Sequence, residues 1–267
     1  MNSFKKYILF FFIVLLSVVF FDDFFFGLLT RARDITYQPK HFYSLAQAPN
    51  HQAWDSLLHK YVSSQGLVNY QGFIKDSVVL HDYLRLLSSN PPNDSLWTKN
   101  ERLAYWINAY NAFTISLVIR HWGIQSIQEI GKGIGTPWNI PFITIGKEKL
   151  SLEDIEHRIL RFMNEPRIHF AINCASISCP KLLNKAYQTQ NIELQLKEQT
   201  IAFLSDTSRN KITEEEVALS RIFQWFKADF EKKQTLYEFI LEYYPISHLK
   251  EHHYLPYDWS LNQETYQ

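Results

Sequence analysis

The chain has 267 residues, of which 46% are hydrophobic and 16% aromatic, so it is long enough to bury the core of one domain. Lysine and arginine together number 27, and aspartate and glutamate also number 27. This balance provides no basic field to hold nucleic acid and no acidic tail. Nucleic-acid binding is therefore excluded as a main role, and partners must be recognised through local sites.

The amino terminus differs from the remainder because it is strongly apolar. Residues 7–21 carry no charge, and the apolar stretch resumes after Asp22 and Asp23 and continues to Leu29. A spanning helix needs about 20 apolar residues, whereas the core of a signal peptide is shorter. Because no small-x-small cleavage site follows, residues 1–29 are predicted to be an uncleaved signal anchor, with a cleaved signal peptide as the alternative.

The charges beside this segment set the expected location. Lys5 and Lys6 precede it and favour a cytoplasmic amino terminus, although Arg31 and Arg33 after it weaken that bias. We expect a single-pass protein of the inner (cytoplasmic) membrane, held through residues 7–29. Residues 30–49 would be a tether, and residues 50–267 a globular domain outside the cytoplasm.

Periodic apolar residues after the tether predict mainly helices. The stretch from Glu101 to Trp122 is apolar nearly all round, which indicates a helix buried at the centre of the domain. Residues 142–150 read as a short hairpin, and Ser151 to Asp154 as a capping box that opens a helix. Further helices are expected near residues 192–204, 222–230 and 236–244. We therefore expect an α+β fold: a mainly helical single domain with a central buried helix and a small antiparallel sheet, preceded by one N-terminal membrane anchor.

Polar residues on one face of the central helix need an explanation. Glu101 and Asn108 lie seven residues apart, and Asn111 follows three residues later. A buried carboxamide without partners costs about 1 to 3 kcal/mol, so both asparagines should bond to backbone and hold loops on the helix. In the alternative interpretation, Glu101 or Asn108 orients a catalytic histidine.

The stretch HFAINCASISCP, residues 169–180, contains both cysteines of the chain. Its apolar opening predicts a strand, in which His169 and Cys174 face opposite sides and lie about 16 Å apart. Three arrangements stay open: the chain bends after Asn173, Cys174 meets another histidine such as His157, or His169 serves the loop that carries Cys179. A disulfide between the two cysteines, which an oxidising compartment would permit, is a further alternative that stays open.

A catalytic thiol needs a thiolate, an imidazole within hydrogen-bond reach, and a carboxylate or amide that orients the imidazole. The chain offers candidates for these three roles in turn: Cys174 or Cys179, His169 or His157, and Glu101, Glu156 or Asn108. It has no C-x-x-C and no H-E-x-x-H motif, so we expect neither a metal site nor a cofactor.

Four separated motifs carry a resemblance to a known family. ERLAYWINAYNAF, LSLEDIEHRILR, RIHFAINCASISCP and YDWSLN follow one another in this order, and the span from Trp54 to Asn262 resembles the domain of unknown function 547 family. The family has no established function, so the resemblance implies little about activity. A relation of its members to papain-like thiol hydrolases would give Cys174 the role of nucleophile and His169 that of base.

Two functions of different classes follow from these residues. The first is an extracytoplasmic Cys-His thiol hydrolase or acyl transferase, in which a thiolate attacks an amide or ester carbonyl. The second is a noncatalytic binding or scaffold domain of the cell envelope, whose aromatic loops around Trp138 and Trp259 contact an envelope peptide, glycan or protein. The first predicts an accessible thiol, and the second predicts a buried or oxidised pair.

Overall fold

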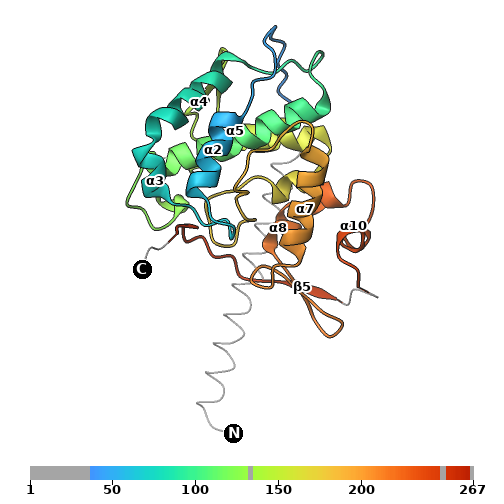
Figure 1. Cartoon of the computed structure of the whole chain (residues 1–267). Coiled ribbons are helices and arrows are strands. Elements are labelled where there is room, and N and C mark those ends of the chain that lie inside the picture. The colour runs from blue at the N-terminus through green and yellow to red at the C-terminus, as the bar shows by residue number, and fades with distance from the viewer. Residues whose placement is uncertain (1–36, 132–134, 247–250, 265–267) are drawn as a thin grey trace. The chain divides into compact units, whose positions relative to one another are not determined.

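The computed structural model describes residues 37–131, 135–246 and 251–264, and one compact unit extends over Pro39–Gln267. Its centre is the long helix α5 (Lys99–Arg120), against which α3 and α4 pack on one side and α7 on another (Figure 1). The bounds of the surrounding helices are α2 (Gln52–Tyr61), α3 (Tyr70–Lys75), α4 (Ser77–Ser89) and α7 (Ile192–Leu204).

Helix α5 is buried on all sides, as its apolar pattern predicted. A capping box opens it: the Thr98 side chain accepts a hydrogen bond from the Glu101 backbone, and Glu101 accepts one from Thr98 at 2.7 Å. Every residue from Leu103 to Val118 is buried. Each large apolar side chain among them contributes about 1.5 to 3 kcal/mol through burial, so this helix organises the core.

The segment after α5 leads to the HFAINC stretch. The predicted hairpin is confirmed as β1 and β2, which turn at Gly146 with a φ of 59°. The predicted capping box at Ser151 and Asp154 is also confirmed. In chain order the elements are η1 (Ile127–Glu129), β1 (Ile143–Ile145), β2 (Glu148–Leu150), α6 (Leu152–Ile155), the π-helix η2 (Glu156–Leu160), and the 3₁₀ helices η3 (Arg161–Met163) and η4 (Pro166–Phe170).

The strand predicted at the start of HFAINC is wrong, because His169 and Phe170 lie in η4. Pro166 stands at the start of that helix, and the Glu165 side chain caps the backbone N–H of Arg167. The backbone N–H of Ala171 then bonds to the carbonyl of Ile168 at 2.9 Å. A 3₁₀ helix rises about 2.0 Å per residue against about 3.3 Å in a strand, so the chain is far more compact here than predicted.

The carboxyl-terminal part contains α7 and a small mixed sheet. The helix predicted over residues 222–230 is broken at Phe226 into α8 and α9. Strand β4 pairs antiparallel with β3 and parallel with β5. The elements are β3 (Lys211–Ile212), β4 (Val217–Leu219), α8 (Arg221–Trp225), α9 (Lys227–Phe230), α10 (Leu236–Tyr243) and β5 (His252–Tyr254).

The predicted fold class needs two corrections. The described strands form two separate sheets, and one of them is mixed, because the chain passes through α8 to α10 before β5 joins β4. In addition, none of the helices within residues 37–131, 135–246 and 251–264 is long and apolar enough to cross a membrane. The anchor predicted over residues 7–29 lies outside the described residues.

Part of the predicted tether packs on the domain. Phe42 is buried, and its ring centroid lies 5.1 Å from that of Trp106 in α5. The indole N–H of Trp97 donates to the carbonyl oxygen of Ala46 at 2.9 Å. The segment before α2 is therefore a component of the folded unit.

Helix η4 is fixed from two sides, because two core clusters meet at it. Ile168 belongs to the cluster around α5, whereas Phe170 belongs to a second cluster formed mainly by the carboxyl-terminal elements. The ring of Phe170 stacks on Phe203 at 4.9 Å between centroids. His169 lies between these two anchors, so its position follows from core packing.

Replacing Phe170 with alanine should destabilise the protein by about 3 to 5 kcal/mol, because it removes a fully buried ring that joins this cluster to η4. Denaturant unfolding of both proteins measures the change. The matched control is Phe162→Ala, which removes a ring that is 45% exposed and should cost less than about 1 kcal/mol. Equal losses in the two variants would show that Phe170 is not a core anchor.

Candidate thiol site

Three carboxamides hold the turn that carries Cys174. Asn111 of α5 donates to the carbonyl of Ala171 at 3.0 Å and accepts from the backbone N–H of Asn173 at 2.8 Å. The Asn173 side chain donates to the carbonyl of Pro180 at 2.8 Å and accepts from Asn262 at 3.3 Å. All three carboxamides are buried, so the chain does bend at Asn173, which was one of the arrangements left open.

The residue after Cys174 has an unusual backbone conformation. Ala175 has a φ of 63°, in the left-handed region that a residue with a Cβ rarely adopts. Its N–H bonds to the Asn173 side chain at 2.9 Å, and its carbonyl accepts from the N–H of Asn262 at 3.2 Å. Strained residues of this kind cost of order 1 to 3 kcal/mol and cluster at functional sites.

The carboxyl-terminal segment brings an aromatic hydroxyl to the thiol. Ser176 and Leu261 form an antiparallel bridge, and the N–H of Ile177 donates to the carbonyl of Ser260 at 2.8 Å. This pairing sets the Tyr257 hydroxyl 3.4 Å from the Cys174 sulfur. The motif YDWSLN therefore completes the site from the far end of the chain.

Cys174 is half-buried, and its neighbours favour the thiolate. Its sulfur lies 3.2 Å from the Ser176 hydroxyl, and its backbone N–H donates to the Cys179 sulfur at 2.9 Å. Burial alone would raise the pKa of Cys174. Hydrogen bonds with Cys179, Ser176 and Tyr257 outweigh burial and lower this pKa to about 7. A large fraction of Cys174 is then ionised at neutral pH.

Cys179 has the opposite character. It is buried, and burial together with its hydrogen bond to Cys174 raises the pKa of Cys179 well above the ordinary thiol value. The Arg209 side chain donates to the carbonyls of Cys179 and Ile177 at 2.7 and 2.6 Å, which fixes the loop. Both cysteines are free thiols, so the structure does not contain the disulfide that was the alternative interpretation.

Glu156 is a buried carboxyl whose negative charge is opposed by that of Cys174. It accepts a hydrogen bond from Tyr110 of α5 at 3.3 Å. Burial raises the pKa of Glu156 to about 8, and negative charge on Cys174 adds to this increase, whereas Arg161 partly offsets it. At neutral pH the site therefore pairs a largely ionised thiol with a protonated carboxylic acid.

His169 is held by acidic groups. Its Nε2 lies 2.8 Å from Asp229, its Nδ1 lies 3.9 Å from Glu156, and its ring stacks on Phe226 with 3.9 Å between centroids. Asp229 also accepts from Arg161 at 2.6 Å. Burial would raise the pKa of Asp229, but His169 and Arg161 outweigh it and hold that pKa well below its usual range.

The predicted site residues thus separate into two groups. Glu156 lies 3.9 Å from His169, Cys174 bonds to Cys179, and electrostatic repulsion links Glu156 to Cys174. His157 joins at the edge through Arg161, whose guanidinium lies 2.8 Å from the Nδ1 of His157. Glu101 caps α5, and Asn108 bonds at both ends to the backbone of Tyr187, which is the structural role expected for it. Among the residues that the structure describes, the hydroxyls of Ser176 and Tyr257, rather than an imidazole, lie within hydrogen-bond distance of the Cys174 sulfur.

Several residues of the site were not predicted. Arg161 follows His157 by one helical turn, a spacing that places both on one face and offered a signal. Asp229 lies 60 residues after His169 in no recognisable motif, so nothing in the sequence indicated it.

A cluster of half-buried aromatic rings lies beside the thiol. Tyr257, which touches Cys174, stands 4.7 Å from Trp225 and 4.5 Å from Trp259 between ring centroids. Trp138 continues the cluster at 5.4 Å from Trp259. These four rings, here called the aromatic cluster, bring together the two aromatic loops that the sequence singled out.

No group of three or more His, Cys, Asp and Glu side chains is placed to hold a metal ion in the described part of the chain.

Comparisons with known proteins agree with the predicted resemblance. Residues 95–204 match the family described as "Protein of unknown function, DUF547". The match contains three of the four motifs and ends before YDWSLN, the motif that carries Tyr257. The search of curated proteins and the search of solved structures found no match.

Removing the Tyr257 hydroxyl should weaken the thiolate. In Tyr257→Phe the pKa of Cys174 should rise by on the order of one unit, because one hydrogen bond to a charged group is lost. The rate of iodoacetamide labelling at Cys174 against pH, followed by peptide mapping, measures this pKa. Tyr43→Phe changes a hydroxyl on an exposed ring and should leave the profile unchanged; no shift in Tyr257→Phe would contradict the assignment.

Glu156 should make stability fall as pH rises. Its folded pKa is about 8 against 4.5 in the unfolded chain, so the folded protein binds more protons between these values. Stability from this group is fully present below about pH 4.5 and is lost as pH rises towards 8. Each unit of pKa difference corresponds to about 1.4 kcal/mol of unfolding free energy. The stability lost through Glu156 between these pH values is therefore at most several kcal/mol, an upper bound.

The free energy of unfolding, measured from pH 5 to pH 8, tests this in wild type and Glu156→Gln. Wild type should lose stability relative to the variant across this window. The titration of His51, whose pKa burial lowers to about 4, is common to both proteins and cancels in the difference. Glu198→Gln, which alters an exposed carboxylate, should run parallel to wild type; a parallel Glu156→Gln curve would refute the raised pKa.

Proposed function

We propose that this chain, in which residues 95–204 match the DUF547 family, is a thiol hydrolase or acyl transferase that uses Cys174 on an amide or ester. The observation that carries the proposal is the half-buried Cys174 thiol, whose hydrogen bonds lower its pKa to about 7. Reactive cysteines have depressed pKa values and partial exposure, whereas structural cysteines are inert and buried. Cys179, buried and with a raised pKa, fits the structural class.

The first step is attack on the carbonyl carbon by the Cys174 thiolate. A C–S bond forms, and the electron pair of the C=O bond moves to the oxygen, which becomes an oxyanion. The hydroxyls of Ser176 and Tyr257, which bond to the sulfur in the free protein, are the nearest donors for this charge. Burial and Cys174 hold the pKa of Tyr257 well above its ordinary value, so this hydroxyl retains its proton.

Glu156 supplies the proton that the leaving group needs. With a pKa raised to about 8 it is protonated when Cys174 is already ionised, which is the pairing required of a general acid beside a nucleophile. The C–N or C–O bond breaks, the leaving group takes the Glu156 proton, and a thioester remains on Cys174. Water or another acceptor then attacks the thioester, returns a proton to Glu156 and releases the thiolate.

His169 acts in this scheme through its neighbours. Its ring is held between Asp229 and Glu156, and its contact with the Glu156 carboxyl at 3.9 Å makes it a positioning residue. The papain-like assignment of His169 as the direct base is replaced here by a thiolate that hydroxyl groups stabilise before substrate arrives. An imidazole is not needed to deprotonate a thiol that ionises near pH 7.

A noncatalytic binding or scaffold role is the second candidate, and the aromatic cluster favours it. The four half-buried rings of this cluster offer a surface for a sugar ring or an apolar side chain. The ring centroids of Tyr257 and Trp259 lie 4.5 Å apart, and those of Trp259 and Trp138 lie 5.4 Å apart. An envelope peptide, glycan or protein is the proposed partner in either role. In the catalytic role, the cluster would hold the substrate beside Cys174.

Aryl and alkyl acetates of increasing leaving-group pKa distinguish these roles. Wild type should form a thioester at Cys174 faster than a free thiol of equal thiolate concentration, and Cys174→Ser should form none. Glu156→Gln should react normally with p-nitrophenyl acetate, whose leaving group needs no proton. It should lose roughly tenfold or more with poor leaving groups such as phenol or alcohols.

The outcomes separate the parts of the scheme. Acylation no faster than that of free cysteine would contradict the hydrolase and favour the binding role. A uniform loss across all esters in Glu156→Gln would retain the nucleophile and reject the general acid. Glu198→Gln serves as the matched control, because Glu198 is an exposed carboxylate that pairs only with Lys185 at 3.9 Å among the described residues.

A further inference from the structure

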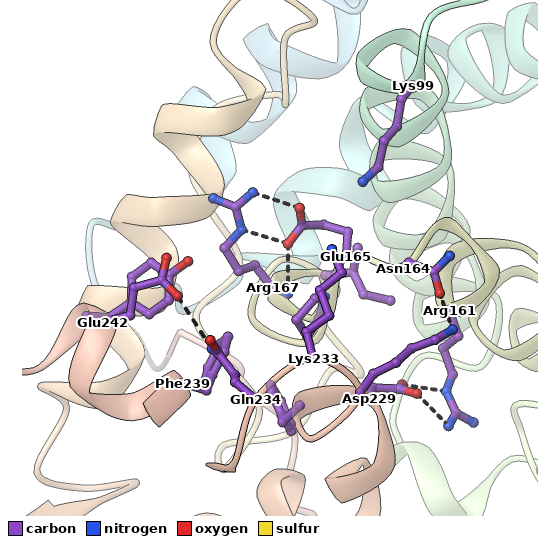
Figure 2. A pocket seen from close by; sticks show the side chains of 15 residues that line it. Lys99, Arg161, Asn164, Glu165, Arg167, Asp229, Lys233, Gln234, Phe239 and Glu242 are labelled. Carbon is purple, nitrogen blue, oxygen red and sulfur yellow. Dashed lines mark hydrogen bonds and ion pairs between the residues drawn. The ribbon is translucent and has the colours of Figure 1, made fainter. Parts of the chain in front are cut away.

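A pocket of about 270 Å³ lies beside the ion pair of Arg161 and Asp229, both of which line it (Figure 2). Its walls come from the start of α5, the segment that joins η3 to η4, and the region from α9 to α10. This volume is near the lower end of small-molecule sites, which span about 300 to 1,000 Å³. A compact ligand, or the head of a larger one, would fit it.

The charged lining of the pocket is predominantly cationic. Five basic and three acidic side chains line it, an excess of two positive charges: Lys99, Arg161, Arg167, Lys232 and Lys233 against Glu165, Asp229 and Glu242. The protein as a whole has no net charge, so this excess is local. A concave surface of one sign concentrates ligands of the opposite sign.

The two arginines of the lining are already paired and rigid. Arg161 binds Asp229 through two nitrogens, at 2.6 and 3.0 Å, and Arg167 binds Glu165 through two nitrogens, at 2.6 and 2.7 Å. Both pairs are visible as dashed lines in Figure 2. Lys232 donates to the Asn164 side chain. The paired arginines therefore form the wall without adding net charge, whereas Lys232 keeps its charge because its partner Asn164 is neutral.

Lys99, Lys232 and Lys233 against Glu242 give that excess, and Lys99 and Lys233 are the two lysines whose ammonium groups have no partner among the described residues. Neither has a hydrogen bond or an ion pair with any residue in the described ranges, and they reach the pocket from separate elements, the first turn of α5 and the segment after α9 (Figure 2). The charge of Lys99 acts on groups of the pocket, because it contributes, together with the hydrogen bonds from Arg167, to lowering the pKa of Glu165. Two ammonium groups at one cavity repel each other unless an anion lies between them.

The remaining lining is mostly apolar or aromatic, with the polar side chains of Asn164 and Gln234. Ile168, Phe230, Phe239 and Tyr243 line the pocket together with the charged groups.

We propose that this pocket binds a small molecule with phosphate or carboxylate oxyanions carrying two or more negative charges, with Lys99 and Lys233 as the groups that select it. Oxyanions accept charge-assisted hydrogen bonds from ammonium groups. The paired arginines, whose guanidinium groups are fixed by their carboxylates, would donate their remaining N–H groups to the same ligand. Anion binding at this site does not require the thiol chemistry, so this proposal is independent of the proposed hydrolase.

Isothermal titration of the whole protein with inorganic phosphate, pyrophosphate and succinate, at constant ionic strength, tests the proposal. At least one probe should bind saturably at one site, and the Lys99→Gln/Lys233→Gln variant should bind it at least about tenfold more weakly. Tighter binding of the phosphates than of succinate identifies phosphate chemistry, and the reverse order identifies carboxylate chemistry. Binding should persist in Cys174→Ser, which removes the proposed nucleophile only.

The matched control is Lys147→Gln/Lys197→Gln, which removes the same charge from exposed lysines outside the pocket. Because Lys99 and Lys233 are also exposed, both double variants should unfold at the wild-type temperature. Absence of saturable binding by all three probes would overturn the proposal. So would unaltered binding in the Lys99→Gln/Lys233→Gln variant, or an equal loss in the control, which would indicate only a response to net charge.

Discussion

The structure around Cys174 depends on three buried carboxamides that join distant parts of the chain. Asn111 belongs to the central helix, Asn173 precedes the cysteine, and Asn262 lies near the carboxyl terminus; each is no more than 3% exposed. A buried amide that loses its hydrogen-bond partner costs about 1 to 3 kcal/mol of folding free energy. Any rearrangement of the turn would break bonds of these side chains and is therefore unfavourable. The left-handed backbone at Ala175 persists because the surrounding hydrogen bonds leave it no alternative.

Around this fixed turn, two groups, the half-buried Cys174 and the buried Glu156, have pKa values shifted in opposite directions. Burial acts to raise the pKa of both Cys174 and Glu156. Hydroxyl and thiol hydrogen bonds reverse the effect at Cys174, whereas Glu156 receives one long hydrogen bond and the added repulsion of the thiolate. The outcome is a largely ionised thiol and a protonated carboxylic acid, which are the states that the proposed nucleophile and general acid require.

Sequence patterns predicted the parts of this arrangement that depend on local order. The buried helix α5, the hairpin and the capping box at Ser151 follow from periodicity, turn residues and spacing along the chain. The strand predicted for the HFAINC segment is wrong because its alternating apolar residues fit both a strand and a 3₁₀ turn that is buried on two sides. Packing of Phe170 in the second core cluster decides between the two. Asp229 and Tyr257 reach the site through tertiary folding, which no spacing along the chain encodes.

The central claim is that hydrogen bonds hold Cys174 as a thiolate near neutral pH. The ultraviolet absorbance of the thiolate, titrated in wild type and in Cys174→Ser, isolates this one group in the difference between the two curves. If the hydrogen bonds outweigh burial, the difference curve has a step centred at about pH 7. A step at the value of an unperturbed thiol, about 8.5, or higher would show that these bonds do not overcome burial, and the nucleophile would be lost with it.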